Sequence, residues 1–186
     1  MAFSSWSKAY FAQACQDFQL AKIGAQEISK HGASVCMLLQ MFFEKYAKAV
    51  FCRMNNNQLP PRNHRTAKTF ISLLRGSSKY SKFKKHINPV INRTSNRPFL
   101  DFFDFISKLE SLQPSNANAG KSEDDSPQLE YPWRNRTSTE FYSPSENLDI
   151  IHEIENPQSR LFTKILPIAQ NLINDFQHFY SKKRFP

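Results

Sequence analysis

Apolar residues recur every three or four positions along the first half of the chain, and this spacing predicts two long amphipathic helices. The first apolar series covers residues 6–28, with Ser4 or Ser5 available as the N-cap. Gly32 follows a histidine in a pattern typical of a helix end, and a second, wider apolar stripe covers residues 35–54. Because the connection is only a few residues long, we expect the two helices to pack as an antiparallel pair.

The polar side chains of these helices are expected to lie off the apolar stripes. Gln13 and Asp17 fall on other faces of the first helix. Glu44 and Lys48 form an i,i+4 pair of favourable order on the outside of the second helix. A polar run followed by Pro60-Pro61 ends that helix, because proline disfavours helical backbone before it and cannot continue a helix.

The middle of the chain carries shorter or less regular patterns. A short helix is predicted at residues 64–74, and a weaker helical pattern covers residues 79–92. Residues 98–112 are apolar almost all round, which is typical of a helix that is central or half-exposed at an interface. Residues 113–130 are rich in Ser, Asn, Asp and Glu, and this composition predicts a mobile acidic loop.

Helical patterns return in the last part of the chain. Ser143, Pro144 and Glu146 have the spacing of a capping box with proline at the first helical position. A final helix is expected to begin near residues 156–157, with a kink or a break at Pro167. These patterns together predict an all-α fold, in one domain that covers residues 1–186.

Composition agrees with this fold class. The chain has 17 Phe but only 4 Gly, which argues against a β-sandwich or barrel with its many tight turns. No apolar run reaches the length of a membrane span, and the first residues lack a signal-peptide pattern. Cys15, Cys36 and Cys52 have no metal-binding spacing, so we expect reduced thiols in a cytoplasmic protein.

Charge is distributed very unevenly along the sequence. Residues 45–100 contain 13 Lys or Arg and no Asp or Glu, whereas the whole chain has 25 basic and 16 acidic residues. Like charges on one surface repel each other, so such a segment suggests a surface that meets a negative partner. RNA or another polyanion is the leading candidate. The alternative is a solvated basic face without a ligand.

Two clusters are candidates for nucleic-acid contacts. Arg62, His64 and Arg65 open the predicted short helix, where guanidinium groups and the helix N-terminus favour a phosphate. Lys84 and Lys85 are further candidates in the same acid-free segment. The alternative for the first cluster is a basic helix start without a ligand.

The second cluster lies after the acidic loop. Arg134 and Arg136 follow Tyr131 and Trp133, and this combination suits stacking on a base with contacts to phosphate. A rigid loop anchored by its aromatic side chains is the alternative.

The sequence carries none of the common catalytic or phosphate-binding motifs. It lacks a glycine-rich phosphate loop and a nucleophile elbow. The five histidines are scattered, and no cysteine–histidine spacing suits a metal. We therefore expect neither a metal nor a cofactor.

The order of several motifs resembles that of the HEPN domain family. The resemblance covers residues 1–75 and, more loosely, 129–180, and it leaves 79–128 as an inserted or divergent segment. The residues that carry it are Asp17-Phe18, the helix 39–49 with Glu44-Lys45 and Lys48-Ala49, Pro60-Pro61 before His64, Leu73-Leu74, and Tyr131-Pro132.

The resemblance implies an up-and-down helical bundle that commonly forms a homodimer. In many HEPN proteins it also implies metal-independent RNA cleavage through an Arg-x(4–6)-His motif, with Arg on the phosphate and His in proton transfer. This sequence departs from the family there, because no histidine follows any arginine at that spacing. Arg134-Asn135 matches only the opening of the motif.

Three functions remain open from the sequence. The favoured one is a non-catalytic HEPN-like module that binds RNA, or a nucleotide-bearing partner, through the basic surface. The second is a metal-independent endoribonuclease with a displaced catalytic set, in which His64 acts with Arg62 or Arg134. The third is a protein-interaction subunit that docks a partner such as a nucleotidyltransferase-type antitoxin or a defence-system component.

Overall fold

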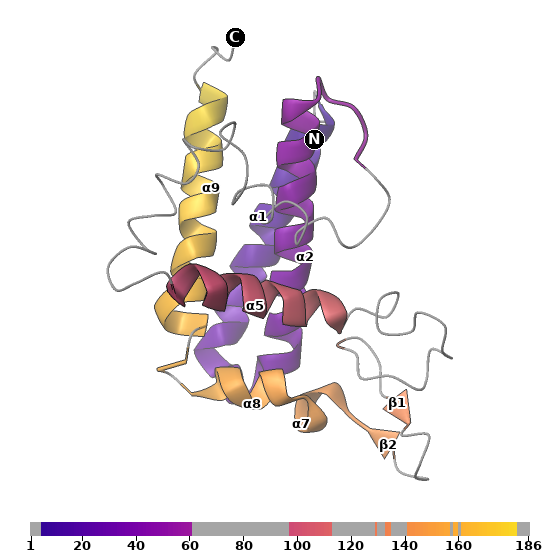
Figure 1. The fold of residues 1–186 in the computed structure, drawn as a ribbon, viewed down its shortest axis with the longest axis vertical. Helices are drawn as coiled ribbons and strands as arrows, with labels where there is room; N and C mark the ends of the chain where they lie inside the picture. The colour runs from indigo at the N-terminus through magenta and orange to yellow at the C-terminus, as the bar shows by residue number, and fades with distance from the viewer. Residues whose placement is uncertain are drawn as a thin grey trace.

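The described part of the chain is predominantly helical, which confirms the predicted all-α class (Figure 1). The computed structural model describes residues 5–60, 97–112, 129, 133–134, 141–156, 158–159 and 161–181. Within these ranges, the side chains of residues 54, 97–103, 133–134, 141 and 177–181 are not described. The predicted helices at 64–74 and 79–92, and nearly all of the segment 113–130, lie outside the described residues. None of the described helices is long and apolar enough to cross a membrane.

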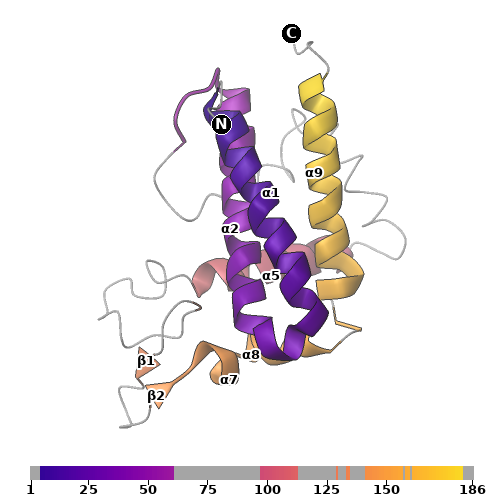
Figure 2. The same cartoon turned by 180° about the vertical axis from the view of Figure 1, so that it is seen from behind.

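Two long antiparallel helices form the centre of the fold. Helix α1 spans Trp6–Gly24, the 3-10 turn η1 spans Ala25–Glu27, and helix α2 spans Ile28–Met54. The Ser5 side chain accepts a hydrogen bond from the Lys8 amide at 3.2 Å, so Ser5 is the N-cap. Figure 1 and Figure 2 show α1 and α2 side by side along their whole length. The predicted helix pair is confirmed.

The position of the turn between them differs from the prediction. Gly32 does not end a helix but lies buried inside α2, and the chain reverses earlier, at η1. A Cβ atom at Gly32 would lie 2.8 Å from Cγ2 of Ile151, which is closer than packed atoms approach. Gly32 is therefore a packing glycine, where a later part of the chain lies directly against the backbone of α2.

The end of α2 is tied to the start of α1. Asn56 and Asn57 have left-handed backbone with φ of 49° and 63°, and the Asn57 amide donates to the Cys52 carbonyl at 2.7 Å. The Asn57 side-chain oxygen accepts from the Ser7 amide at 3.1 Å, and the Ser7 hydroxyl donates to the Ala49 carbonyl at 2.6 Å. These bonds fix the direction in which the chain leaves α2.

Helix α5 spans Arg97–Ser111 and crosses the long helices instead of running beside them (Figure 1). In its described half, Phe105, Ile106 and Leu109 are buried whereas Asp104 and Lys108 are exposed. This half is therefore amphipathic, and not apolar almost all round as predicted. Just beyond it, the amide of the buried Leu129 donates to the Leu112 carbonyl at 3.0 Å. The far end of the predicted acidic loop is thus packed against the end of α5.

A short strand pair and two short helices follow. Strand β1 (Trp133–Arg134) pairs antiparallel with β2 (Phe141–Tyr142), and α7 (Pro144–Asn147) and α8 (Asp149–Glu155) come next. Ser143 caps α7 and Pro144 is at its first position, as predicted. The capping box is wrong, because the Ser143 amide donates to the Asn147 side chain at 2.9 Å and not to Glu146. The helix consequently stops after one turn.

The final helix begins with a widened turn. A π-helical turn, η4, spans Leu161–Ile165 and leads into α9, which spans Leu166–Ser181 and contains Pro167 as its second residue. Proline has no amide hydrogen and crowds the carbonyl of the residue four positions earlier, so a regular helix is interrupted just before it. The predicted break at Pro167 is confirmed. Helix α9 runs in the same direction as α2 and opposite to α1, and α5 crosses between them in the sequence, so the predicted up-and-down order holds only for α1 and α2 (Figure 1).

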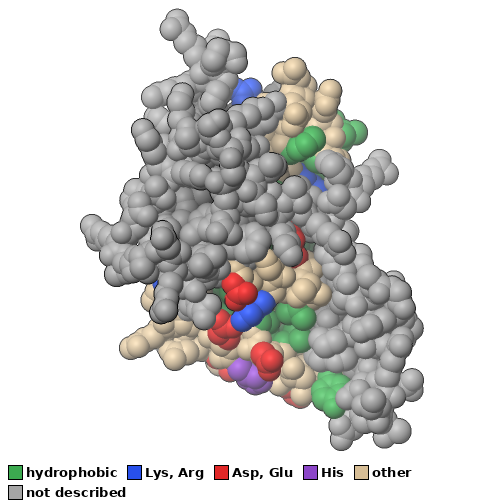
Figure 3. All heavy atoms as spheres, viewed as in Figure 1, with side chains coloured by type: hydrophobic (Ala, Val, Ile, Leu, Met, Phe, Trp, Pro, Cys, Tyr) green, Lys and Arg blue, Asp and Glu red, His purple; other side chains and the backbone are tan. Residues whose placement is uncertain are grey.

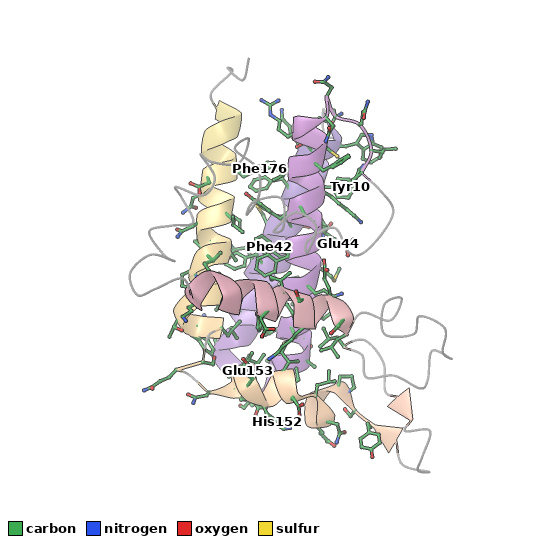
Figure 4. The ribbon with its side chains drawn as sticks, in the orientation of Figure 1. Tyr10, Phe42, Glu44, His152, Glu153 and Phe176 are labelled. Atoms are coloured by element: carbon green, nitrogen blue, oxygen red, sulfur yellow. The ribbon has the colours of Figure 1, made fainter. Side chains whose placement is uncertain are left out.

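An aromatic cluster joins these three helices. The rings of Phe11 and Phe176 stack with centroids 4.0 Å apart, and Tyr46 lies edge-on to both. Phe42 packs on Tyr46 and on Phe18 at centroid distances of 5.8 and 5.2 Å. Figure 4 shows Phe42 and Phe176 between α9 and the α1–α2 pair. The core therefore sits where the apolar stripes of the two predicted helices meet the last one.

The contact at Gly32 gives a stability prediction. In Gly32→Ala the added methyl group meets Ile151 in a packed core, which costs about 1–3 kcal/mol. Alanine regains roughly 1 kcal/mol from helix propensity. The free energy of unfolding should therefore fall by up to about 2 kcal/mol. Urea unfolding followed by circular dichroism measures the difference. Ser34→Ala, at an exposed position of the same helix, is the control and should lose nothing. Equal stabilities of the two variants would contradict the packing role.

Candidate functional site

The residues predicted to contact nucleic acid fall almost entirely outside the described part of the chain. Arg134 lies in β1, where its backbone pairs with Phe141, and its side chain is not described. The two catalytic candidates, His64 and Arg134, are therefore not brought together by any described contact. The candidates that lie outside the described residues are Arg62, His64, Arg65, Lys84, Lys85 and Arg136.

The first lysine of the acid-free segment is used inside the fold. Lys45 Nζ lies 2.7 Å from Asp17 Oδ2, which joins α2 to α1. The Asp17 side chain is 4% exposed and the Lys45 side chain 21%. Gln13 Nε2 donates to the other Asp17 oxygen at 3.2 Å, so both carboxylate oxygens are bonded. Asp17 does not merely fall on another face of α1, as predicted, but is buried at the helix–helix interface.

Lys48, the second lysine of the acid-free segment, is also largely buried. Lys48 Nζ lies 2.5 Å from Glu44 Oε1, which confirms the predicted i,i+4 pair. The pair is not on the outside of α2, because the two side chains are only 11% and 13% exposed. Figure 4 shows Glu44 on the same stretch of α2 as the aromatic core.

These ion pairs have a structural role. Burying a charge is costly unless an opposite charge and hydrogen bonds compensate it, and both pairs provide that compensation. Asp17, Glu44, Lys45 and Lys48 are also the charged residues of the HEPN-like motifs. In this chain, Asp17 and Lys45 join α1 to α2, whereas Glu44 and Lys48 pair within α2.

The sequence contained a signal for the Asp17–Lys45 pair. In an antiparallel helix pair, residues about equally far from the connection lie opposite each other, as Phe18 and Phe42 do. Asp17 precedes Phe18 in the sequence and Lys45 follows Phe42, and the two have opposite charges. A search for opposite charges across the predicted pair would have found them.

A surface of the opposite sign lies on α5, α7 and α8. Lys108 Nζ bridges the two longer helices, at 3.1 Å from Glu153 and 3.6 Å from Asp104. Glu146 and Asp149 are exposed nearby on α7 and α8. Figure 3 shows the acidic side chains gathered around one basic side chain and one histidine. The part of the chain that the structure describes therefore presents an acidic face here.

His152 is the histidine of this face, and its contacts are structural. Its Nε2 lies 3.1 Å from the Glu146 carbonyl oxygen, and its Nδ1 lies 3.8 Å from Glu155. Because a carbonyl oxygen only accepts, Nε2 is the donor of this bond, which holds the end of α7 against α8. Figure 4 shows Glu153 and His152 as neighbours on α8. Neighbouring carboxylates would repel a phosphate, so this histidine is a poor candidate for RNA chemistry. Among the described residues, no group of three or more metal-ligating side chains occurs.

The three cysteines are free thiols, and they lack the character of nucleophiles. Cys36 and Cys52 are buried and Cys15 is half-buried. Burial raises the pKa of all three, and the Glu153 carboxylate raises the pKa of Cys36 further. Because the thiolate is the reactive form, these groups are mostly protonated and poorly reactive at neutral pH.

The buried ion pair gives a second prediction. Asp17→Asn is expected to lower the free energy of unfolding by about 1–3 kcal/mol, because Lys45 loses its charged partner in a partly buried site. The matched control is Glu27→Gln, which removes an acid from the exposed pair with Lys30. The control should cost less than about 1 kcal/mol. Chemical unfolding of both variants makes the comparison, and equal losses would contradict the role of Asp17.

Thiol labelling gives a third prediction. A chromogenic disulfide reagent should react first with Cys15, whereas Cys36 and Cys52 should react only as the protein unfolds. Reactivity should increase as the pH rises, because the raised pKa values keep the thiols protonated near neutrality. Cys15→Ser should remove the early phase. An early phase that survives in this variant would show that a buried cysteine is accessible.

Comparison with protein-family models, with curated proteins and with solved structures found no match. The HEPN resemblance therefore stays a prediction that rests on the motifs of the sequence.

Proposed function

We propose that this protein is a non-catalytic helical module that binds RNA through the basic segment of residues 45–100. The observation that carries the proposal is the density of positive charge that is left after the internal ion pairs are removed. Lys45 and Lys48 are bonded to Asp17 and Glu44, so 11 of the 13 basic residues of the segment lie outside these pairs. No acidic residue interrupts them.

The first residues of the basic segment, up to residue 60, lie in the described part of the chain. Arg53 is exposed in the last turn of α2. The loop that follows is held by the bonds from Asn57 to Cys52 and to Ser7. The chain therefore enters the rest of the basic segment from an anchored point, at the end of the fold where α1 begins.

The distribution of charge along the chain favours one side for RNA. Residues 101–155 contain 12 acidic and 4 basic residues. Apart from the buried Glu110, the acidic residues whose side chains are described form the acidic face on α5, α7 and α8. A polyanion is repelled by that face and attracted by the basic segment. The opposed charges support a defined orientation of the RNA, and not a uniform basic coat.

The proposal excludes catalysis on two grounds. The sequence has no arginine at the Arg-x(4–6)-His spacing before His64. The described His152 is bonded to a backbone carbonyl and surrounded by carboxylates. Proton transfer at a ribose hydroxyl needs a histidine beside a bound phosphate. His64 lacks the arginine of the motif in the sequence, and the carboxylate near His152 repels a phosphate.

Salt dependence tests the proposal. The affinity for a single-stranded RNA should fall steeply with rising salt, because each phosphate neutralised by Lys or Arg contributes roughly 0.7 to the slope of log K against log salt. Changing Arg62, Arg65, Lys84 and Lys85 together to Gln should lower the affinity at low salt and reduce that slope by about 3. Fluorescence anisotropy over a salt series measures both.

The matched control changes lysines outside the segment. Lys8→Gln with Lys30→Gln removes two exposed charges and should leave the slope almost unchanged. Binding that is absent at low salt, or equally affected by both sets of changes, would contradict the proposal. RNA should also be recovered at full length in EDTA. Cleavage that His64→Ala abolishes would favour the ribonuclease instead.

A further inference from the structure

Acidic residues are missing from one end of the helix bundle. Helix α1 begins where α2 and α9 end, and Figure 1 and Figure 2 both show these three helix termini at the same end of the molecule. Three separate parts of the sequence without any Asp or Glu meet there, namely residues 1–16, 45–100 and 176–186. We call this the acid-free end, and its described residues are 5–16, 45–60 and 176–181.

The acid-free end carries positive charge. The acids that border it are Asp17, Glu44 and the half-buried Asp175, and the first two are each bonded to a lysine. Arg53 is exposed in the last turn of α2, and the sequence has three basic residues at 182–184, just beyond α9. A polyanion that approaches the start of the basic segment therefore meets no acidic side chain among the described residues of this end.

An indole ring is exposed at the acid-free end. Trp6 is 50% exposed in the first turn of α1, although tryptophan side chains are highly buried on average. Its ring centroid lies 6.4 Å from that of Tyr10, with 38° between the two planes. Tyr10 packs in turn against the hydrophobic core, and Figure 4 shows it at this end of the bundle. The indole is therefore supported by the fold and still half open to solvent.

Hydrogen bonds hold Trp6 close to the loop that leads into the basic segment. The amide of Ser7, the next residue, donates to the Asn57 side chain at 3.1 Å, and the Ser7 hydroxyl donates to the Ala49 carbonyl at 2.6 Å. Leu59, two residues beyond Asn57, is itself 56% exposed. The backbone that carries the indole is therefore fixed on the point from which the basic segment continues.

An exposed indole beside a positively charged segment suits an unpaired nucleotide. Every base has a flat face that stacks on an aromatic ring, and its phosphate carries the charge that Lys and Arg attract. In a duplex the bases are stacked on each other, so their faces are not accessible to a side chain. Positive charge alone would attract either form of RNA, whereas the indole adds a contact that only unpaired bases can make.

We propose that Trp6 stacks on an unpaired base of a single-stranded RNA whose phosphates bind the basic segment. The inference rests on the proposed RNA binding, and it adds a contact site and a preference for single strands. The site is distinct in sequence from the predicted cluster at Trp133.

Tryptophan fluorescence tests the stacking directly. The chain has two tryptophans, so Trp133→Phe leaves Trp6 as the only one. A single-stranded oligouridine added at low salt should quench the emission of this variant, with the same midpoint as binding measured by fluorescence anisotropy of labelled RNA. The same oligouridine annealed to oligoadenine should bind more weakly and quench little. Binding that leaves the Trp6 emission unchanged, or equal quenching by the duplex, would overturn the inference.

Substitution of Trp6 tests the size of the contact. Trp6→Ala should lower the affinity for oligouridine about 5- to 150-fold, which is the usual range for one stacked base, and Trp6→Phe should recover part of the loss. The slope of log K against log salt should not change, because stacking releases no counterion. Leu20→Ala is the matched control, since Leu20 is 54% exposed on the same helix but lies outside the acid-free end. Circular dichroism should show unchanged helix content in all three variants.

The outcomes separate this inference from the proposed function. Affinity that falls when Arg62, Arg65, Lys84 and Lys85 are changed, but not in Trp6→Ala, would overturn the stacking and leave the RNA proposal standing. No binding at low salt would overturn both. Equal losses in Trp6→Ala and Leu20→Ala would also overturn the stacking, because they would indicate a general effect on the fold. Vesicles of anionic lipid that shift the Trp6 emission when RNA does not would assign this end to a membrane surface instead.

Discussion

The hydrogen bond from the Tyr46 hydroxyl to the Leu172 carbonyl oxygen, 3.1 Å long, determines how the last helix sits on the first two. Tyr46 is only 1% exposed, so its hydroxyl must find a partner inside the core. Stacked rings tolerate small shifts of α9, whereas a directional bond to one carbonyl favours one register. The rings of Phe11 and Phe176 pack around Tyr46 and support the same arrangement. Helix α5 crosses the frame that α1, α2 and α9 form (Figure 1).

Electrostatics acts in this protein at two levels. Inside, Asp17–Lys45 links α1 to α2 and Glu44–Lys48 pairs within α2, and in each poorly solvated pair one charge compensates the other. Along the chain, a basic segment is followed by an acidic one, and charges of one sign are concentrated on each. The Asp17–Lys45 pair stabilises the contact between the two long helices. The second creates surfaces that discriminate between partners by sign.

The proposed RNA binding relies on concentrated positive charge and on released counterions. The loop after α2 is bonded to Ser7 at the start of α1, so the chain continues into the rest of the basic segment from a fixed point on the helix pair.

The sequence by itself determined the local features of this protein. Apolar spacing is a property of neighbouring residues, so the helix pair, the Ser5 cap, the helix near residues 98–112 and the break at Pro167 were all predictable. The charge of residues 45–100 was predictable as well, but not which of its lysines are internal, because that depends on Asp17 and Glu44. Only the tertiary structure decided that Gly32 packs against Ile151 and that Asn147 displaces Glu146 at the start of α7. Such outcomes depend on partners brought together by folding or on competition between nearby side chains, and residue spacing does not encode either.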